Sequence, residues 1–299
     1  MTCAIGLDIG GTKIAGALYD DAGSELTREW RPTPSSYEAF LDVCASVVHA
    51  LEDKGSGATL GVCAPYVDET TCSNIPYLAG KNLSKDFAAL FKRSVPLTND
   101  ANCAALAEAL EGAGRGFRSV FGLILGTGVG GGFVLDGRLW TGLHGLAAEV
   151  GHLPLPYCDD ADGPMVYCSG CGQTGCIEQH ISGGSLARLY AFLTKKEADA
   201  KTIATLARQG DPDALRVLDR YYTIVAKAMT LVLHTFDPDV ITVSGGLNAL
   251  PGLYEAVPER WGLYSICKKP KTRFVPSSFG ALAGMRGAAL MGQRAQRFG

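Results

Sequence analysis

The 299-residue sequence has no long apolar run, no excess of basic charge and no leader-like N-terminus. Its longest apolar stretches, such as Val120–Leu125, are far too short to span a bilayer. The net charge is -3, so no basic field favours nucleic acid or an anionic membrane. Residues 1–8 contain neither the basic segment nor the long apolar segment of a secretory signal. We therefore expect a cytoplasmic protein with no membrane partner and no nucleic-acid partner.

The residues that are abundant suggest a well-packed chain with many tight turns. Hydrophobic residues make up 47% of the sequence, and the length suits two domains or one large one. In the cytoplasm, its 10 cysteines should be free thiols or metal ligands rather than disulfides. Many of the 38 glycines are clustered, which indicates turns that lie close to a ligand.

A pattern of strand, glycine turn and strand occurs twice. Residues 3–19 are predicted to form a β-hairpin around Gly10-Gly11-Thr12. Residues 120–135 are predicted to form a second hairpin around Gly126–Gly132. Such a repeat suggests that the chain consists of two related halves.

The repeat also predicts where the domains divide. We assign residues 1–118 and a C-terminal helix at 281–299 to a smaller α/β domain. Residues 119–280 form a larger α/β domain that contains a cysteine-rich loop. No low-complexity linker separates the two, so the boundary near residue 118 depends on the repeat alone.

Three glycine-rich turns follow apolar strands, at Gly10–Thr12, Gly126–Gly132 and Ser244–Gly246. Glycine lets backbone N–H groups approach phosphate oxygens without an intervening Cβ. One such turn can be merely tight, but three in one chain predict a nucleotide-phosphate site. Asp8, beside the first turn, is suited to hold Mg²⁺ or its waters, although it could instead cap the turn.

Gly126–Gly131 also fits the dinucleotide pattern Gly-x-Gly-x-x-Gly, which is a weak indication by itself. That pattern should open a helix, whereas the β-type residues Phe133-Val134-Leu135 predict a return strand. The return strand argues against a dinucleotide site, so a nicotinamide-dependent dehydrogenase is kept only as an alternative from a different class of enzyme.

Asn99-Asp100 lies between a short strand and an alanine-rich helix. Asp or Asn at such a place is ordinarily a helix N-cap. Phosphoryl transfer to an alcohol, however, needs an oriented carboxylate to accept the hydroxyl proton. Because ligands tend to bind beyond the carboxyl ends of strands, Asp100 is the candidate for that base.

A cysteine-rich loop predicts a metal site. Cys168, Cys171 and Cys176 place three thiols in nine residues, and His152 lies sixteen residues before the first. One His and three Cys form a closed tetrahedral zinc site, so the metal would be structural. Free thiols are the alternative, and Cys158 is a competing ligand.

Glu149 and Glu178 flank this loop, close in sequence to His152 and Cys176. The loop would bring the two carboxylates towards one place. Carboxylates and a ring nitrogen suit a polyhydroxyl ligand, because each can accept hydrogen bonds from sugar hydroxyls.

Taken together, these motifs resemble the ROK family of sugar kinases and repressors, within the actin-like ATPase superfamily. The similarity runs over essentially the full length. It implies an α/β fold of two ribonuclease-H-like domains flanking an active-site cleft. The motifs are Asp8-Ile9-Gly10-Gly11-Thr12-Lys13, Asn99-Asp100-Ala101-Asn102, Gly126-Thr127-Gly128, Glu149-Val150-Gly151-His152, Cys171-Gly172-Gln173-Thr174-Gly175-Cys176-Ile177-Glu178 and Gly245-Gly246.

The resemblance implies an ATP-dependent kinase in which Asp100 is the general base towards the 6-hydroxyl of a hexose. The implied sugar contacts are Asn99, Asp100, Glu149, His152 and Glu178. The implied sites for ATP and Mg²⁺ are Asp8, Gly10, Gly11, Thr12, Lys13, Gly126, Thr127, Gly128, Gly245 and Gly246. The implied zinc ligands are His152, Cys168, Cys171 and Cys176, with His152 binding metal and sugar through its two ring nitrogens.

Within the family, the sequence is most similar to the members that phosphorylate N-acetyl-D-glucosamine, and we expect that substrate. Fructose, glucose, mannose and allose are the alternatives. Two departures from the family pattern are the wider spacing between Cys168 and Cys171, and Tyr66 at a position near the sugar.

Two further expectations follow from the resemblance. A sugar-responsive repressor would need a DNA-binding segment before the first strand, for which the sequence before Cys3 leaves no room. We expect a monomer or a homodimer.

Overall fold

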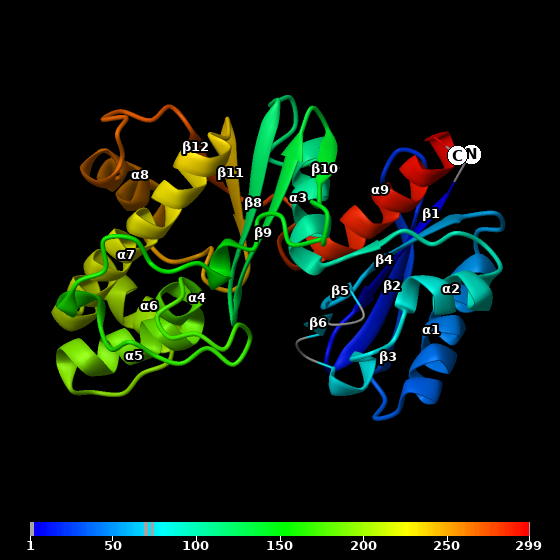
Figure 1. The fold of residues 1–299 in the computed structure, drawn as a ribbon, viewed down its shortest axis with the longest axis horizontal. Helices are drawn as coiled ribbons and strands as arrows, with labels where there is room; N and C mark the ends of the chain where they lie inside the picture. The colour runs from blue at the N-terminus through cyan, green and yellow to red at the C-terminus, as the bar shows by residue number, and fades with distance from the viewer. Residues whose placement is uncertain (1–2, 69–70, 73–74, 299) are drawn as a thin grey trace.

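The computed structural model describes residues 3–68, 71–72 and 75–298, which fold into two five-stranded sheets flanked by helices (Figure 1). The strand orders are β3-β2-β1-β4-β7 and β10-β9-β8-β11-β12. In each sheet, the first three strands of this order are antiparallel to one another, and the last two pair in parallel with the third. The predicted α/β architecture of two ribonuclease-H-like sheets is confirmed.

The first sheet consists of β1 (Ala4–Ile9), β2 (Lys13–Tyr19), β3 (Glu25–Pro32), β4 (Thr59–Cys63) and β7 (Leu97–Thr98). The second consists of β8 (Ser119–Leu125), β9 (Val129–Leu135), β10 (Arg138–Trp140), β11 (Val240–Ser244) and β12 (Arg273–Pro276). A separate short pair is formed by β5 (Tyr66–Asp68) and β6 (Thr71–Cys72).

The α-helices are α1 (Tyr37–Glu52), α2 (Leu83–Phe91), α3 (Asp100–Leu110), α4 (Glu178–Ile181), α5 (Gly183–Thr194), α6 (Ala200–Arg208), α7 (Pro212–Phe236), α8 (Leu253–Tyr264) and α9 (Ala283–Phe298). Four 3₁₀ turns occur at η1 (Pro76–Leu78), η2 (Val150–His152), η3 (Asp160–Asp162) and η4 (Gly280–Leu282). No helix among the described residues is sufficiently long and apolar to traverse a lipid bilayer.

Both predicted hairpins are present. β1 and β2 close at the pair Ile9↔Ile14, and β8 and β9 close at Leu125↔Val129. The second turn is shorter than predicted, since β9 already begins at Val129. The extra glycines belong to the strand because helix α3 lies against it: a Cβ on Gly132 would lie 2.6 Å from the carbonyl oxygen of Ala101.

Helices α3 and α9 lie between the two sheets (Figure 1). Helix α9 packs on the first sheet, where a Cβ on Gly6 would lie 1.9 Å from the carbonyl oxygen of Met285. The two helices also approach each other closely, because a Cβ on Gly287 would lie 1.8 Å from the carbonyl oxygen of Cys103. The two halves thus meet through a tightly packed pair of helices.

The described chain passes between the two sheets twice. It first leaves β7, runs through α3 and enters β8. It later leaves β12 and returns through η4 into α9. Helix α3 precedes residue 118 but packs against β8 and β9 of the second sheet. The domain boundary near residue 118 stays a prediction.

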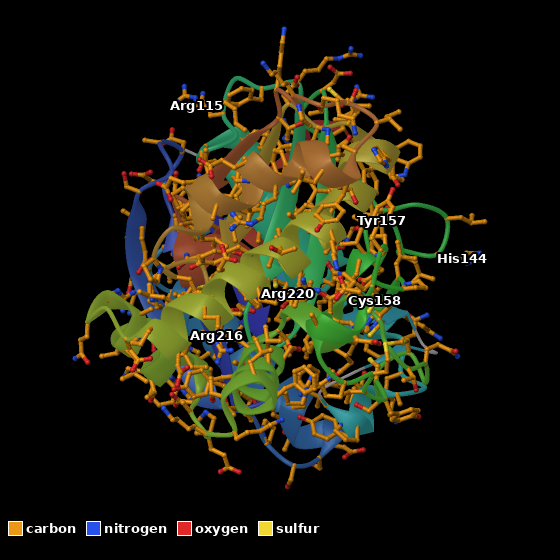
Figure 2. All side chains as sticks on the ribbon, turned by 90° about the vertical axis from the view of Figure 1, so that its left-hand side faces the viewer. Arg115, His144, Tyr157, Cys158, Arg216 and Arg220 are labelled. Atoms are coloured by element: carbon orange, nitrogen blue, oxygen red, sulfur yellow. The ribbon has the colours of Figure 1, made fainter. Side chains whose placement is uncertain are left out.

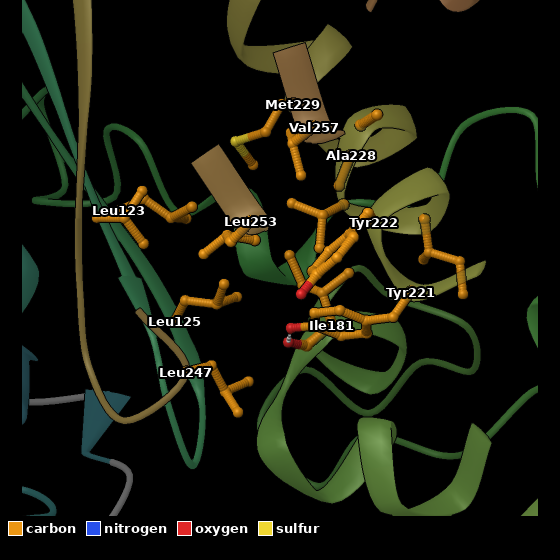
Figure 3. Packing of buried hydrophobic residues seen from close by; sticks show 14 of the residues in the cluster. Leu123, Leu125, Ile181, Tyr221, Tyr222, Ala228, Met229, Leu247, Leu253 and Val257 are labelled. Carbon is orange, nitrogen blue, oxygen red and sulfur yellow. Dashed lines mark hydrogen bonds between the residues drawn. The ribbon is translucent and has the colours of Figure 1, made fainter. Parts of the chain in front are cut away.

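The larger core lies between the second sheet and helices α4–α8 (Figure 3). Leu123 and Leu125 of β8 are buried and belong to the same apolar cluster as Tyr221 of α7. The Tyr221 hydroxyl donates to the carbonyl oxygen of Ile181 at 2.6 Å. Each fully buried aliphatic side chain contributes about 1.5–3 kcal/mol. This packing fixes the second glycine turn relative to α4 and α5.

Candidate active site

A cavity of about 300 Å³ lies where the two halves meet. Its walls come from the first glycine turn, from the N-terminal ends of α3 and α9, and from the ends of β8 and β11. The lining residues are Asp8, Ile9, Gly10, Gly11, Pro65, Asp100, Ala104, Ile124, Ser244, Gly245, Gly280, Ala281, Ala283 and Gly284. Two carboxylates and several small residues therefore face one space.

The N-cap of α3 is Asn99, not Asp100. The Asn99 side chain accepts a hydrogen bond from the Asn102 amide at 2.8 Å, and Asp100 is the first residue of the helix. Asp100 Oδ1 accepts the adjacent Ala101 amide at 2.9 Å. Because Asn99 satisfies the helix terminus, the Asp100 carboxylate is free to face the cavity.

The Asp100 side chain is exposed to the open cavity, while the surrounding protein withdraws much of the solvent from its carboxyl. This desolvation raises the pKa of its carboxyl above the ordinary value, against the effect of the Ala101 amide. A raised pKa makes the carboxylate a stronger base once it is ionised.

Asp8, at the end of β1, is the second carboxylate in the cavity. Burial raises its pKa, and the nearby charge of Asp100 raises it further. The Cys63 thiol and the Lys13 ammonium act in the opposite direction. Two facing carboxylates in a partly dehydrated space form a site that favours a divalent cation or its bound waters.

Asn99, Glu149, His152 and Glu178 gather next to Asp100. The Asn99 amide group donates to Glu149 Oε1 at 2.9 Å. Burial raises the pKa of Glu149, His152 lowers it, and the charges of Asp100 and Glu178 raise it. The structure thus brings together all five residues predicted to contact a sugar.

The predicted metal ligands also come together. One donor atom from each of His152, Cys168, Cys171 and Cys176 lies within 4.8 Å of the other three. Cys168 Sγ is 3.8 Å from His152 Nδ1. A tetrahedron with metal–ligand bonds of about 2.0–2.3 Å has edges of roughly 3.3–3.8 Å, so the Cys168–His152 separation suits zinc, and one imidazole with three thiols is a zinc donor set.

The wider spacing between Cys168 and Cys171 does not displace Cys168 from this group. Burial acts to raise the pKa of Cys168, but hydrogen bonds from the Cys171 and Gly170 amides outweigh it and lower the pKa to about 7. Burial and the neighbouring Cys168 thiol raise the pKa of Cys176 to about 12. Cys158 is exposed beside Tyr157 and lies outside the group (Figure 2).

Glu178 joins the thiol group to the second glycine turn. Its Oε2 accepts the Val129 amide at 3.0 Å, and its Oε1 lies 3.8 Å from Cys168 Sγ. At the turn itself, the Gly126 carbonyl accepts the Gly183 amide of α5 at 2.8 Å. The thiol loop, the acidic cluster and this turn therefore form one connected unit.

The predicted phosphate residues divide into two groups. Asp8, Gly10, Gly11 and Gly245 line the cavity, whereas Thr12, Lys13, Gly126, Thr127, Gly128 and Gly246 do not. The second and third turns are nevertheless adjacent, since the Leu247 amide donates to the Leu125 carbonyl at 3.0 Å. Gly126–Gly131 leads into strand β9 and not into a helix, contrary to the dinucleotide pattern.

Sequence reasoning missed the segment Gly280–Gly284, which forms a wall of the cavity at the start of α9. Backbone N–H groups at a helix N-terminus favour an anion. Its small residues, Gly280, Ala281, Ala283 and Gly284, were the available indication. The side chain of Tyr66 lies outside the described residues.

Comparisons with known proteins agree with this geometry. The ROK family profile matches residues 4–295. An N-acetyl-D-glucosamine kinase from Shigella boydii serotype 4 (strain Sb227) is 39% identical over 300 residues, covering 96% of this chain and 98% of the relative. An N-acetylgalactosamine kinase, AgaK, from Shewanella sp. (strain ANA-3) is 37% identical over 295 residues, covering 96% of each.

A solved structure supports the same relationship. The ROK hexokinase from Thermus thermophilus has a TM-score of 0.85 with this chain at 32% identity, and the superposition covers 100% of both chains. The paired sheets and the helices between them are therefore shared over the whole length.

Proposed function

Because this chain belongs to the ROK family and is an ATP-dependent hexose kinase, we propose that it phosphorylates the 6-hydroxyl of N-acetyl-D-glucosamine with Asp100 as the general base. The observation that supports this most directly is the place of the Asp100 carboxylate. The carboxylate lines a cavity whose small residues suit phosphates, and it lies next to an acidic cluster that suits a sugar.

Asp100 has the freedom and the proton affinity that a base requires. Asn99 takes the N-cap role, and burial raises the Asp100 pKa. As the sugar hydroxyl attacks the γ-phosphorus, Asp100 would accept the hydroxyl proton. Phosphoryl transfer depends mainly on positioning and electrostatics, so this single proton transfer is the main covalent task of a side chain.

The phosphates would lie along the glycine amides of the first turn and the N-terminal end of α9. Gly10 and Gly11 offer backbone without a Cβ, and Gly284 lies at the start of α9. Asp8 would hold Mg²⁺ or its waters, and the metal supplies neutralisation of phosphate charge when bound. Gly126–Gly128 and Gly245–Gly246 would complete the nucleotide site from the second half.

Asn99, Glu149, His152 and Glu178 would orient the sugar. Two of these side chains are hydrogen-bonded to each other, since the Asn99 amide group donates to Glu149. His152 faces the thiols through Nδ1, which leaves Nε2 for a sugar hydroxyl. We propose that His152, Cys168, Cys171 and Cys176 bind a structural zinc ion, which would hold this ring in place.

The choice of sugar is tested by a coupled ADP-release assay. The panel comprises N-acetyl-D-glucosamine, N-acetylgalactosamine, N-acetylmannosamine, glucose, fructose, mannose and allose. We expect the highest kcat/KM with N-acetyl-D-glucosamine and a 6-phosphate product by ³¹P NMR. A preference for another sugar would refute the proposed substrate alone, whereas no ADP release with any sugar would refute the kinase function.

A further inference from the structure

Glu108 is a buried carboxylate outside the cavity described above, with an exposed fraction of 1%. It lies on α3 and accepts four hydrogen bonds. The donors are the Ala113 amide at 2.8 Å, the Ser277 hydroxyl at 2.5 Å, the Ser278 amide at 3.1 Å and the Phe279 amide at 3.0 Å. None of the ion pairs between described residues includes Glu108, so the contacts of its carboxyl oxygens are to these neutral donors.

The four donors come from two different connections. Ala113 lies between α3 and β8, which is the first passage of the chain between the sheets. Ser277–Phe279 lies between β12 and η4, which is the second passage. Hinges are usually a few loop residues or element ends that absorb changes in φ and ψ. Glu108 therefore ties together the two segments by which the chain passes between the sheets.

We propose that Glu108 is a hinge latch: a positioning residue that holds both passages in the arrangement from which the cavity closes on sugar and ATP. The latch deepens the proposed function and rests on it, because it presumes two substrates bound across a closing cavity. Glu108 does not contact the cavity itself.

The latch is connected to both walls of the cavity. Asp100 and Glu108 lie on the same helix, eight residues and about 12 Å apart. On the other side, the Ser277 hydroxyl accepts the Gly280 amide at 2.8 Å, and Gly280 lines the cavity. One buried carboxylate thus fixes the helix of the proposed base relative to the wall at the start of α9.

A second contact near the same place shows by comparison what is particular to Glu108. The Glu111 carboxylate, just after α3, accepts two hydrogen bonds from Arg286 of α9, at 2.6 and 2.5 Å. This pair joins the two inner helices to each other but not the two passages. Glu108 is distinguished by contacting both passages at once.

The latch predicts a particular kinetic effect. If the closing arrangement is populated less, the apparent affinity of every ligand that needs it falls by the same factor. The KM of the sugar and the KM of ATP should then rise together, while kcat at saturation changes less. Loss of folded protein would instead lower the apparent kcat and leave both KM values unchanged.

The test uses Glu108→Gln, with Asp239→Asn as the matched control. Asp239 also accepts an amide and a hydroxyl, both from Ser119, but it joins β8 and β11 within one sheet. With N-acetyl-D-glucosamine and MgATP as probes, we expect both KM values of Glu108→Gln to rise about tenfold, within the range that small misplacements cause. Asp239→Asn should keep both KM values of the wild type.

Hydrogen exchange of the ligand-free chain provides a readout that does not depend on catalysis. Glu108→Gln should speed exchange at residues 111–117 and 277–282 together, and Asp239→Asn at neither, since the Asp239 carboxylate contacts Arg118 and Ser119, just beyond the first segment. Unchanged KM values in an active Glu108→Gln enzyme, a rise in one KM only, or faster exchange in one segment only would overturn the latch. Wild-type inactivity with every sugar would overturn the kinase function, while the exchange result would still decide the latch.

Ser277→Ala provides a milder variant should Glu108→Gln not fold. It removes one donor to Glu108 together with the acceptor of the Gly280 amide, and it leaves the three backbone amides that donate to Glu108 in place. We expect the same paired rise in KM and the same paired change in exchange, with smaller size. Wild-type values for Ser277→Ala, together with an unfolded Glu108→Gln, would show Glu108 to be a core residue without a hinge role.

Discussion

The two halves of the molecule have the same backbone at the cavity but different side chains. Asp8 in the first half and Ile124 in the second occupy equivalent positions, each one residue before the strand pair that closes its hairpin. Both residues line the cavity. The inner helices show the reverse arrangement: α3 begins with Asp100 and α9 with Ala283, which also face the cavity. Each equivalent pair thus supplies one carboxylate and one apolar group.

The packing of the inner helices is duplicated as well. Gly6 and Gly122 both lie three residues before the closing pair of their hairpins. A Cβ on Gly6 would lie 1.9 Å from Met285 O of α9, and one on Gly122 would lie 2.7 Å from Ala105 Cα of α3. Both halves therefore need a glycine where an inner helix packs on the sheet, whereas the side chains that the two halves present to the cavity differ.

Replacement of the acid at the start of α3 should have the largest effect. Asp100→Asn keeps the size of the side chain and an oxygen for the Ala101 amide, but an amide cannot accept the sugar proton. We expect kcat to fall by about a hundredfold or more, the usual contribution of general-base catalysis. Sugar affinity, measured by calorimetry, should change little.

The control for this variant is Asp136→Asn, a surface carboxylate that pairs with Arg118. It should retain the wild-type kcat in the ADP-release assay. Near-normal turnover in Asp100→Asn would show that Asp100 is not the general base, although α9 has Ala283 at the equivalent position.

The shared packing can be tested at the equivalent glycines. Gly6→Ala places a methyl group against a backbone oxygen, and Gly122→Ala places one against Ala105. Overpacking of this kind costs about 1–3 kcal/mol or more. We expect both variants to lower the free energy of unfolding, with the larger loss for Gly6→Ala, because a backbone oxygen at 1.9 Å cannot move away alone.

Gly184→Ala is the matched control for these two substitutions. Gly184 is exposed in the first turn of α5, and its Cβ would have 3.5 Å to its nearest neighbour, the Arg188 guanidinium. Alanine in a helix is favoured over glycine, so urea unfolding should show unchanged or increased stability. Equal stability of all three variants would contradict the duplicated packing.

Sequence patterns predicted the strands that frame the site, because alternating glycine turns and apolar runs are local features. They also brought His152, Cys168, Cys171 and Cys176 into one predicted group, since these ligands are close in sequence. The role of Gly280–Gly284 in the cavity, and that of Glu108, depends on contacts between segments far apart in the chain. The small residues at Gly280–Gly284 indicate a close approach of the backbone, but no local pattern says which distant segment they face.

Removal of the proposed zinc ion should affect the sugar side of the site more than the nucleotide side. The thiol group contacts Glu178 and His152, whereas Asp8, Gly10 and Gly11 lie in the other half. We expect a chelator to weaken sugar binding about tenfold, the lower end of what neighbouring shells of a metal site contribute. ATP affinity should change less.

Two controls make the metal experiment specific. Metal content is measured alongside circular dichroism, so that unfolding is not mistaken for loss of binding. Cys158→Ser, outside the thiol group, should keep both metal and sugar affinity. Unchanged sugar affinity in metal-free, folded protein would contradict the role proposed for His152.

The smallest expected effect concerns pH and stability, and it has opposite signs at two carboxylates. Burial raises the folded-state pKa of Asp100 above 3.8, so its stabilising contribution is present below that pH and is lost as pH rises through the folded pKa. Hydrogen bonds from Ser119 lower the pKa of Asp239, so its contribution is present above 3.8 and is lost as pH falls.

At neutral pH, Asp100→Asn should therefore unfold at a slightly higher temperature than the wild type, and Asp239→Asn at a lower one. The difference for Asp100→Asn should shrink as the pH falls through the raised folded pKa towards 3.8, whereas that for Asp239→Asn should shrink only as the pH falls below 3.8. Thermal unfolding at a series of pH values measures this. A lower melting temperature for Asp100→Asn at pH 7 would mean that the wild-type carboxylate stabilises the fold. Asp100 would then be a structural group, and not an ionised acid that destabilises the fold and is kept for catalysis.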